Sequence, residues 1–443
     1  MPSAARRLLH VAVSALALLG APRAADAFCG FYVAQADSKL FNQASQVVLV
    51  RDGERTVVTM SNDYKGELTD FALVVPVPTV LKREQIHIGD RKHLERVDAY
   101  SSPRLVEYFD EDPCAPPVPP VVPSQMAPTS ADKSASMGAE RSQALGVTVE
   151  AQYTVGEYDI VILSAKQSDG LETWLRESGY KVPPRSAAAL KPYIKQDMKF
   201  FVAKVNLENQ RESGFQYLRP LQMAYESKKF MLPIRLGMAN AEGPQDLVIF
   251  TLTRNGRVES TNYRTVKVPS DVEVPIFVKS DFGNFYKALF DRAHEKAGHR
   301  ALHTEYFWDM GSCDPCSADP LSPEELKGLG VFWRDEQSYA PVLLTRLHVR
   351  YDSEHFPEDL VFQETSDQEN FQGRYILRHA FQGEAKCSAA KRYWEGVNKR
   401  RQKEAQTLAR LTGWSPATIQ ERMGKDAPMQ KGKEPAWYEK LWK

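Results

Sequence analysis

The sequence predicts an α+β protein with a mainly antiparallel β-sheet, a few packed helices and a helical C-terminal tail. Short runs of β-branched and aromatic residues recur between Gly and Pro turn signals, which is typical of many strands. Several of these runs come in pairs across a short turn, and this arrangement favours antiparallel pairing. Helical patterns come in blocks, without strict alternation with the strands, so the sequence indicates the α+β class.

The first elements predict a β-hairpin and then a buried strand. Residues 46–51 and 56–61 carry valines on both sides of Asp52-Gly53, a turn signal for a short hairpin loop. Residues 68–77 form a largely apolar run that ends at the prolines of residues 76–78, so we expect a strand buried on both faces. Further strands are expected at residues 147–155, 158–163, 199–207, 229–236, 247–253, 258–268, 274–278, 342–351 and 359–363.

One more turn signal and three helical stretches complete the pattern. Asn255-Gly256 lies between two expected strands and predicts a second hairpin. A helix is expected to begin at Asp169 as N-cap, with Glu172 completing a capping box. Another helix is expected at residues 282–296, and from Ser388 the pattern is helical and rich in Lys and Arg nearly to the C-terminus.

The N-terminus has the features of a secretory signal peptide at residues 1–27. Arg6 and Arg7 precede an apolar run at residues 8–19, and Ala-Asp-Ala at residues 25–27 is a small-residue cleavage site. We therefore expect an exported protein of the periplasm or extracellular space. No later segment holds eighteen uninterrupted apolar residues, so no transmembrane helix is expected in the mature chain.

The rest of the chain is expected to divide into a core and a tail. The core spans residues 28–384 and contains a Pro/Ala/Ser-rich segment at residues 113–146, whose composition predicts disorder. The basic helical tail spans residues 385–443. A basic amphipathic helix contacts an anionic surface or an acidic partner, or docks on the core by a thin apolar stripe, and the sequence leaves both interpretations open.

The charge balance excludes one large class of function. The chain of 443 residues has 57 Lys and Arg against 57 Asp and Glu, so its formal net charge is zero. Proteins that bind nucleic acid usually carry a basic excess, so we expect no nucleic-acid partner.

The cysteines predict at least one disulfide, because exported thiols meet an oxidising compartment. Cys313 and Cys316 form a C-x-x-C pair in a loop-like, Pro-containing setting, so a structural bond is favoured over redox catalysis. Cys29 and Cys114 are the other disulfide candidates, and Cys387 is an alternative partner for a cysteine of the C-x-x-C pair. The odd number of cysteines leaves one free or paired elsewhere, and the connectivity stays open.

Catalytic motifs are incomplete. His294 and His299 flank a Glu but are five residues apart, which is one too many for a zinc-protease helix. His299 and His303 have i,i+4 spacing, although surface histidines near a helix end are the simpler interpretation. Residues 388–391 match S-x-x-K without its companion motifs. The sequence thus identifies no catalytic residue, and we expect no cofactor and no metal.

The chain resembles the exported bacterial proteins of domain-of-unknown-function family 2330. The segments that carry the resemblance are residues 28–31, 59–64, 71–78, 103–108, 156–165, 232–238, 243–247 and 313–316. The resemblance implies export, and it supplies no catalytic residue because the family has no assigned reaction.

These observations favour a non-enzymatic, envelope-associated or extracytoplasmic binding module. The alternatives are a thiol–disulfide oxidoreductase that uses Cys313 and Cys316, and a hydrolase without a recognisable motif. A binding module predicts a concave or apolar surface without a perturbed titratable pair, whereas an oxidoreductase predicts an exposed thiol of low pKa.

Overall fold

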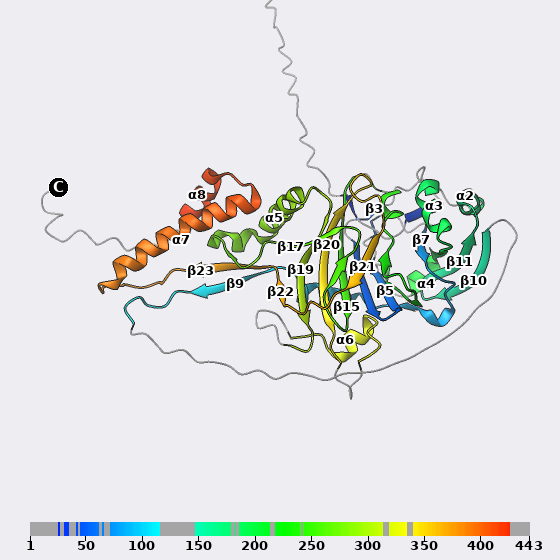
Figure 1. Ribbon diagram of the computed structural model, residues 1–443, viewed down its shortest axis with the longest axis horizontal. Helices are drawn as coiled ribbons and strands as arrows, with labels where there is room; N and C mark the ends of the chain where they lie inside the picture. The colour runs from blue at the N-terminus through cyan, green and yellow to red at the C-terminus, as the bar shows by residue number, and fades with distance from the viewer. Residues whose placement is uncertain are drawn as a thin grey trace, which may run out of the picture.

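The computed structural model describes residues 25–26, 31–34, 41–42, 45–61, 64–65, 71–115, 147–178, 182, 186–212, 218–239, 241, 243–312, 319–334 and 340–425. Within these residues the chain is an α+β protein, as the sequence predicts (Figure 1). Most strand pairs are antiparallel, but the largest sheet also contains parallel pairs and is therefore mixed. Most of the predicted signal peptide and residues 116–146 of the Pro-rich segment lie outside the described residues.

The large sheet forms the centre of the molecule. Its strands lie in the order β17 (Arg264–Lys267), β19 (Ala301–Asp309), β20 (Leu343–Tyr351), β15 (Gln245–Thr253), β4 (Ser45–Asp52), β5 (Arg55–Ser61), β13 (Leu221–Glu226) and β8 (Ile86–Ile88), with β1 (Ala25–Asp26) beside β15 and β22 (Phe371–Gln372) beside β19. The predicted first hairpin is confirmed, because β4 pairs with β5 across Gly53, which adopts φ +59°.

The small sheet packs face to face on the large one. Its antiparallel strands are β10 (Val147–Val155), β11 (Tyr158–Ala165), β12 (Lys199–Val205), β7 (Phe71–Val77) and β2 (Phe31–Ala34). Strand β4 shows how the sequence builds this packing, because Val47 and Leu49 point into the core between the sheets while Val48 and Val50 point to the other side. All four are at most 1 % exposed, which explains the continuous apolar run.

Helices cover both outer faces, which makes four layers (Figure 1). Leu171 of α2 (Ser168–Glu177) and Leu190 of α3 (Ser186–Lys195) pack on the small sheet. Leu94 of α1 (Arg91–Ser101) and Leu326 of α6 (Pro323–Gly328) pack on the large sheet. Helix α5 (Phe282–Lys296) lies on the same outer face, where Phe290 stacks on the His348 ring at 3.7 Å.

Short elements connect these layers. They are β3 (Phe41–Asn42), β6 (Tyr64–Lys65), η1 (Arg83–Gln85), α4 (Leu207–Glu212), β14 (Met231–Leu232), η2 (Gly237–Ala239), β16 (Val258–Ser260) and β21 (Leu360–Glu364). Strand β21 pairs with both β14 and β16, so it ties two distant loops together.

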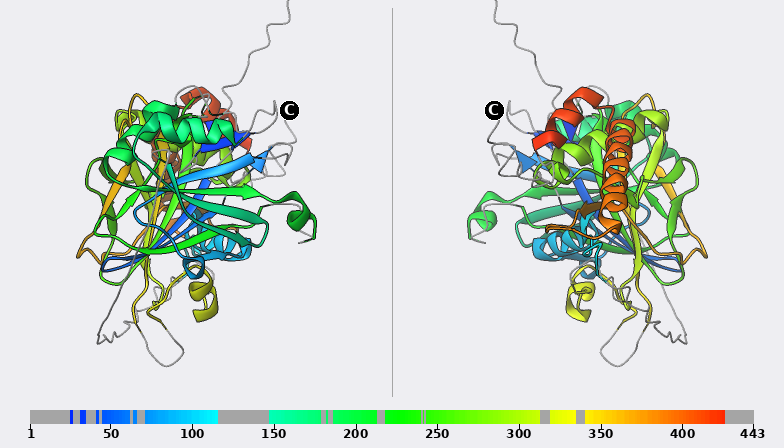
Figure 2. Two further views of the ribbon diagram at one scale, coloured as in Figure 1. Left: turned by 90° about the vertical axis from the view of Figure 1, so that its right-hand side faces the viewer. Right: turned by 90° about the vertical axis from the view of Figure 1, so that its left-hand side faces the viewer.

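An arm extends from the large sheet beyond α5 (Figure 1). We define the arm as β9 (Arg104–Phe109), β18 (Val272–Glu273), η3 (Ile276–Asp281), β23 (Arg374–His379), α7 (Ala389–Thr412) and α8 (Pro416–Lys425). Its sheet has the order β18-β23-β9 and is parallel throughout. Tyr375 of β23 contacts Phe285 of α5 edge-on at 5.0 Å, and Leu408 of α7 joins the same core. Seen from the end of the arm, α7 and α8 lie in front of the large sheet (Figure 2).

The predicted hairpin at Asn255-Gly256 is wrong. Strand β15 already pairs on one side with β20 and on the other with β4, so the following chain cannot pair back on it. The chain instead leaves the sheet, and β16 pairs with β21. A Cβ on Gly256 would lie 2.0 Å from the carbonyl oxygen of Thr365, so this turn requires glycine for close approach rather than for a hairpin.

Four local expectations also need correction. Asp169 lies in the first turn of α2, whose N-cap is Gln167, so the predicted capping box does not form. The run at residues 258–268 is divided between β16 and β17. Residues 274–278 do not form a strand, because Pro275 begins the 3-10 helix η3. The C-terminal helix is interrupted at Gly413, which ends α7 with φ +74°.

Candidate functional site

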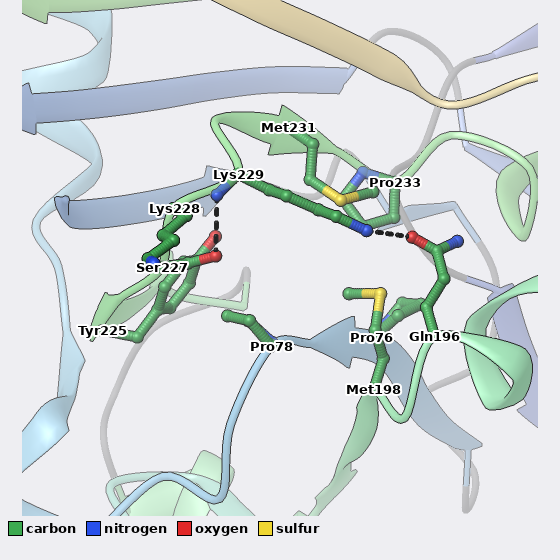
Figure 3. A pocket seen from close by; sticks show the side chains of 10 residues that line it. All are labelled: Pro76, Pro78, Gln196, Met198, Tyr225, Ser227, Lys228, Lys229, Met231 and Pro233. Atoms are coloured by element: carbon green, nitrogen blue, oxygen red, sulfur yellow. Dashed lines mark hydrogen bonds between the residues drawn. The ribbon is translucent and has the colours of Figure 1, made fainter.

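A cavity of about 260 Å³ lies at one end of the small sheet (Figure 3). Strand β7 ends there, the segment before β12 forms a second wall, and the connection from β13 to β14 forms a third. The residues that line the cavity are Pro76, Pro78, Gln196, Met198, Tyr225, Ser227, Lys228, Lys229, Met231 and Pro233. Three prolines and two methionines make about half of this lining apolar, and that part suits a small apolar group.

Lys229 provides the polar end of this cavity. Its Nζ donates a hydrogen bond to Oε1 of Gln196 at 2.6 Å, so the two side chains meet across the cavity (Figure 3). Its backbone N–H donates to Oγ of Ser227 at 3.2 Å. An ammonium group has three donors, so Lys229 retains donor capacity toward a carboxylate or carbonyl oxygen of a ligand.

Asp359 positions two walls of the cavity from behind. Its Oδ1 accepts hydrogen bonds from Tyr193 Oη at 2.6 Å and from the backbone N–H of Ile234 at 2.9 Å. Tyr193 belongs to α3, just before Gln196, and Ile234 follows Pro233. Burial raises the pKa of Asp359, although these hydrogen bonds oppose the rise.

The same carboxylate explains why residues 229–236 do not form the predicted long strand. Only Met231–Leu232 is a strand, as β14. The next two backbone N–H groups, of Ile234 and Arg235, bind Asp359 instead of a neighbouring strand. The pocket therefore depends on a buried side chain far away in the sequence.

A second polar cluster lies between the large sheet and its helices, and we call it the charge ladder. It runs through alternating acidic and basic side chains from α1 to α5, in the order Asp98, Arg346, Glu305, His348, Asp246, Arg350 and Asp291. Glu305 lies at the centre, where it accepts from Arg346 Nε at 2.6 Å and lies 2.8 Å from Nδ1 of His348.

The ladder strongly changes the protonation of its members. Burial alone would lower the pKa of His348, but the charges of Glu305 and Asp246 and the hydrogen bonds to them raise it to about 9. Burial alone would raise the pKa of Glu305, but the charges of His348 and Arg346 lower it to about 2. The ladder therefore contains an imidazolium whose two ring N–H groups are both bound to carboxylates. Such a group has no free lone pair to act as a general base.

The sequence shows the ladder only weakly. Arg346, His348 and Arg350 alternate with apolar residues along β20, a pattern that normally indicates a solvated sheet face. The signal that distinguishes this face is the pair of acidic residues on the neighbouring strands, Asp246 and Glu305, and it becomes visible only with the strand register.

The histidines suggested by the sequence are not arranged on one helix face. His299 follows α5 in a left-handed conformation with φ +57°, and His303 lies in β19. The surface interpretation is confirmed for His299, which is exposed, and is wrong for His303, which is buried. Burial lowers the pKa of His303 and of the likewise buried His294 to about 4. No group of three or more His, Cys, Asp or Glu in the described part of the chain could hold a metal ion.

The cysteine candidates have different outcomes. Cys114 forms a disulfide with Cys387, with a Cα–Cα distance of 5.6 Å, and this bond joins the end of β9 to the start of α7. This pairing differs from the expectation from the sequence, in which Cys387 is a partner only for the C-x-x-C pair. Cys29, Cys313 and Cys316 lie outside the described residues.

The fold and the cavity define a four-layer α+β protein with a small pocket at one end of its small sheet. The sequence model of a family described as an uncharacterized protein conserved in bacteria, DUF2330, matches residues 23–363. The chain therefore belongs to this family, in agreement with the resemblance noted from the sequence. No curated protein and no solved structure matches the chain. Among the described residues, no helix is both long and apolar enough to cross a membrane.

Proposed function

We propose that this protein is an exported, non-enzymatic binding module that takes a small ligand in the pocket of Figure 3. The composition of the pocket carries the proposal, because its described lining holds no Asp, Glu, His or Cys. The groups with large pKa shifts belong instead to the charge ladder and to buried structural positions. A ligand with a short apolar body and one carboxylate suits apolar walls with Lys229 at one end.

The hydrolase alternative has less support, because general base catalysis needs an imidazole or carboxylate within reach of the substrate. The thiol–disulfide alternative depends on Cys313 and Cys316. It is tested directly by measuring the reduction of insulin disulfides with the wild-type protein and with Cys313→Ser. Turnover that disappears in the variant would replace the binding proposal with redox catalysis.

The binding experiment uses thermal unfolding with a panel of small carboxylates that carry apolar tails, next to their amide analogues. A ligand that binds only the folded protein raises the melting temperature, and the rise continues with the logarithm of the ligand concentration above the Kd. We expect stabilisation by one or more carboxylates and a loss of that effect in Lys229→Met. The matched control is Lys82→Met, an exposed lysine outside the pocket. Equal stabilisation of wild type and Lys229→Met, or none by any carboxylate, would overturn the proposal.

Export is tested separately by cell fractionation of the full chain and of a chain without residues 2–27. We expect the full chain outside the cytoplasm and the shortened chain inside it. A full chain that stays in the cytoplasm would contradict the export part of the proposal and leave the pocket experiment unaffected.

A further inference from the structure

The arm contains a second and larger cavity, a groove of about 670 Å³ between α7 and the arm sheet. Its lining residues are Asp110, Pro113, Glu273, Arg378, Ala389, Arg392, Tyr393, Gly396, Val397, Arg400 and Lys403. The groove shares no residue with the pocket of Figure 3. It also lies mostly on elements after residue 363, where the family match ends.

One face of α7 forms a wall of the groove. Residues 389, 392, 393, 396, 397, 400 and 403 recur every three or four positions, so they lie on the same side of the helix. Arg392 and Lys403 are the first and last cationic residues of this wall, about 16 Å apart along the axis at 1.5 Å per residue. That length matches about five residues of an extended peptide at 3.3 Å per residue.

Gly396 in the middle of this wall has no packing role within the described structure. It is exposed, and a Cβ added to it would meet no atom within 4 Å. Glycine inside a helix costs about 1 kcal/mol relative to alanine, so this position carries a cost that the internal packing does not explain. A bare backbone at the centre of a groove lets another chain approach closely.

The charges of the groove are unequal. Four cationic side chains line it, Arg378, Arg392, Arg400 and Lys403, against the two acidic side chains Asp110 and Glu273. Asp110 accepts from Arg400 at 2.7 Å, and Glu273 accepts from Arg378 at 2.8 Å.

The remaining cations are Arg392 and Lys403, which lie about 16 Å apart along the wall. Both are exposed, and neither forms an ion pair with any residue that the structure describes. The groove therefore offers unneutralised positive charge at two separate points of a concave surface.

We propose that this groove binds an extended acidic segment of a partner protein, with carboxylates at Arg392 and Lys403 and its backbone over Gly396. The concave shape favours a peptide over a membrane, because a flat anionic surface makes its contacts with a convex basic face. The proposal concerns a different surface from the small-ligand pocket, and it identifies the kind of partner that the basic C-terminal helix contacts.

The disulfide fixes one end of the groove. Pro113 precedes Cys114 directly, Ala389 follows Cys387 by two residues, and both Pro113 and Ala389 line the cavity. We therefore expect reduction of this bond to weaken binding of the acidic segment, because the two walls lose their covalent link.

The experiment measures fluorescence anisotropy of a labelled peptide with six alternating Glu and Gly residues, using the full exported chain. A Gln/Gly peptide of equal length serves as the neutral probe. We expect binding of the acidic peptide only, and a loss of about tenfold or more in affinity for Arg392→Glu combined with Lys403→Glu. The matched control is Lys391→Glu combined with Lys399→Glu, which makes the same charge change on exposed α7 residues outside the groove.

A second variant tests the shape of the groove without changing its charge. Gly396→Leu removes the helix cost of glycine and fills the groove, so we expect unfolding stability to be kept or raised while peptide affinity falls about tenfold. Equal losses in the two charge-reversal variants would mean that only general electrostatic attraction operates. Unchanged affinity in Gly396→Leu would mean that the peptide does not occupy the groove, and either result would overturn the proposal.

Anionic vesicles test whether the basic helix contacts a lipid surface instead of a peptide. Vesicles that contain phosphatidylserine as their anionic lipid are used in the same experiment with the same variants. We expect little binding of vesicles by the wild-type protein. Tight vesicle binding that outcompetes the peptide would assign the surface to lipid instead.

Discussion

The arm differs in construction from the rest of the described structure, which we call the body. In the body, the large and the small sheet pack face to face and helices cover both outer faces, so each layer is buried by its neighbours. In the arm, short parallel strands from distant parts of the sequence meet, and a disulfide joins β9 to α7. The body is therefore held by extensive burial and internal charge pairing. The arm depends on a few long-range connections.

The family match has a corresponding limit. It covers residues 23–363, which include most of the body together with β9 and β18, and it ends before β23 and α7. The arm therefore combines strands from inside the matched region with elements after it. Substitutions that change the stability of only one of the two regions test this division.

The largest effect is expected for Glu305→Gln in the body. This change leaves Arg346 and the protonated His348 buried without their shared carboxylate, and breaking a buried charge pair costs about 3–5 kcal/mol. Denaturant unfolding measures the loss. The control is Glu226→Gln, which removes the ion pair of Glu226 with Arg55. Arg55 is 42 % exposed, and the loss of such an exposed ion pair costs about 0–1 kcal/mol. Equal effects of the two variants would show that the charge ladder does not stabilise the body.

The arm should respond most to loss of the disulfide. Cys114→Ser removes a bond between residues 273 positions apart, and native disulfides stabilise by about 2–4 kcal/mol. We expect faster hydrogen exchange in α7 and α8, with exchange in β15 and β20 unchanged. Faster exchange throughout the body would contradict the independence of the two regions.

The pH dependence of stability should be set by the ladder and the buried histidines. The pKa of His348 is about 9 instead of 6.5, so its contribution is full below pH 6.5 and is lost as the pH rises toward 9. Glu305, with a pKa of about 2 instead of 4.5, contributes fully above pH 4.5 and loses its contribution as the pH falls toward 2. Buried neutral His294 and His303, with pKa values of about 4, favour unfolding as the pH falls from 6.5 to 4.

Stability measured by urea unfolding should therefore be greatest near pH 6.5 and fall on both sides. His348→Gln should remove most of the alkaline decrease while leaving in place the acid decrease from the buried residues His294 and His303. An alkaline decrease of the same size in this variant would show that another group causes it.

A smaller effect is expected for Asp359→Asn behind the pocket. The amide keeps the size of the side chain but replaces a carboxylate oxygen that accepts from Tyr193 and Ile234, so we expect a loss of about 1–3 kcal/mol. Ligand affinity in the pocket should fall as well, because both walls lose a common anchor. Glu358→Gln, the exposed neighbour, is the control.

The smallest effect is expected for Asp169→Ala. Because Asp169 is not the N-cap of α2, the change should alter stability by less than about 0.5 kcal/mol. A loss of about 1 kcal/mol or more would indicate a true cap and would support the interpretation from the sequence.

The sequence predicts those parts of the fold in which the decisive contacts are local. Asp52-Gly53 connects a hairpin because the facing edges of β4 and β5 are free to pair with each other. Asn255-Gly256 carries the same turn signal but forms no hairpin. Both edges of β15 are already paired with strands from elsewhere in the chain, β20 and β4. Local turn chemistry cannot indicate which edges are already paired.

The candidate sites are harder to predict for the same reason. Pro76 and Pro78 indicate the end of a strand in the sequence. They line a pocket because Asp359, far away in the sequence, positions the other two walls. The groove depends on the register of β9 against β23, two strands with no sequence pattern that pairs them. The sequence shows the basic face of α7 but does not show the concave surface to which this face contributes.

The disulfide has a consequence for any cut in the backbone. Cys114 and Cys387 close a covalent ring that contains residues 115–386, including most of the Pro/Ala/Ser-rich segment. A single nick anywhere in this ring opens it without releasing either product. Such a nicked molecule migrates as one species until it is reduced, and only then divides into two fragments.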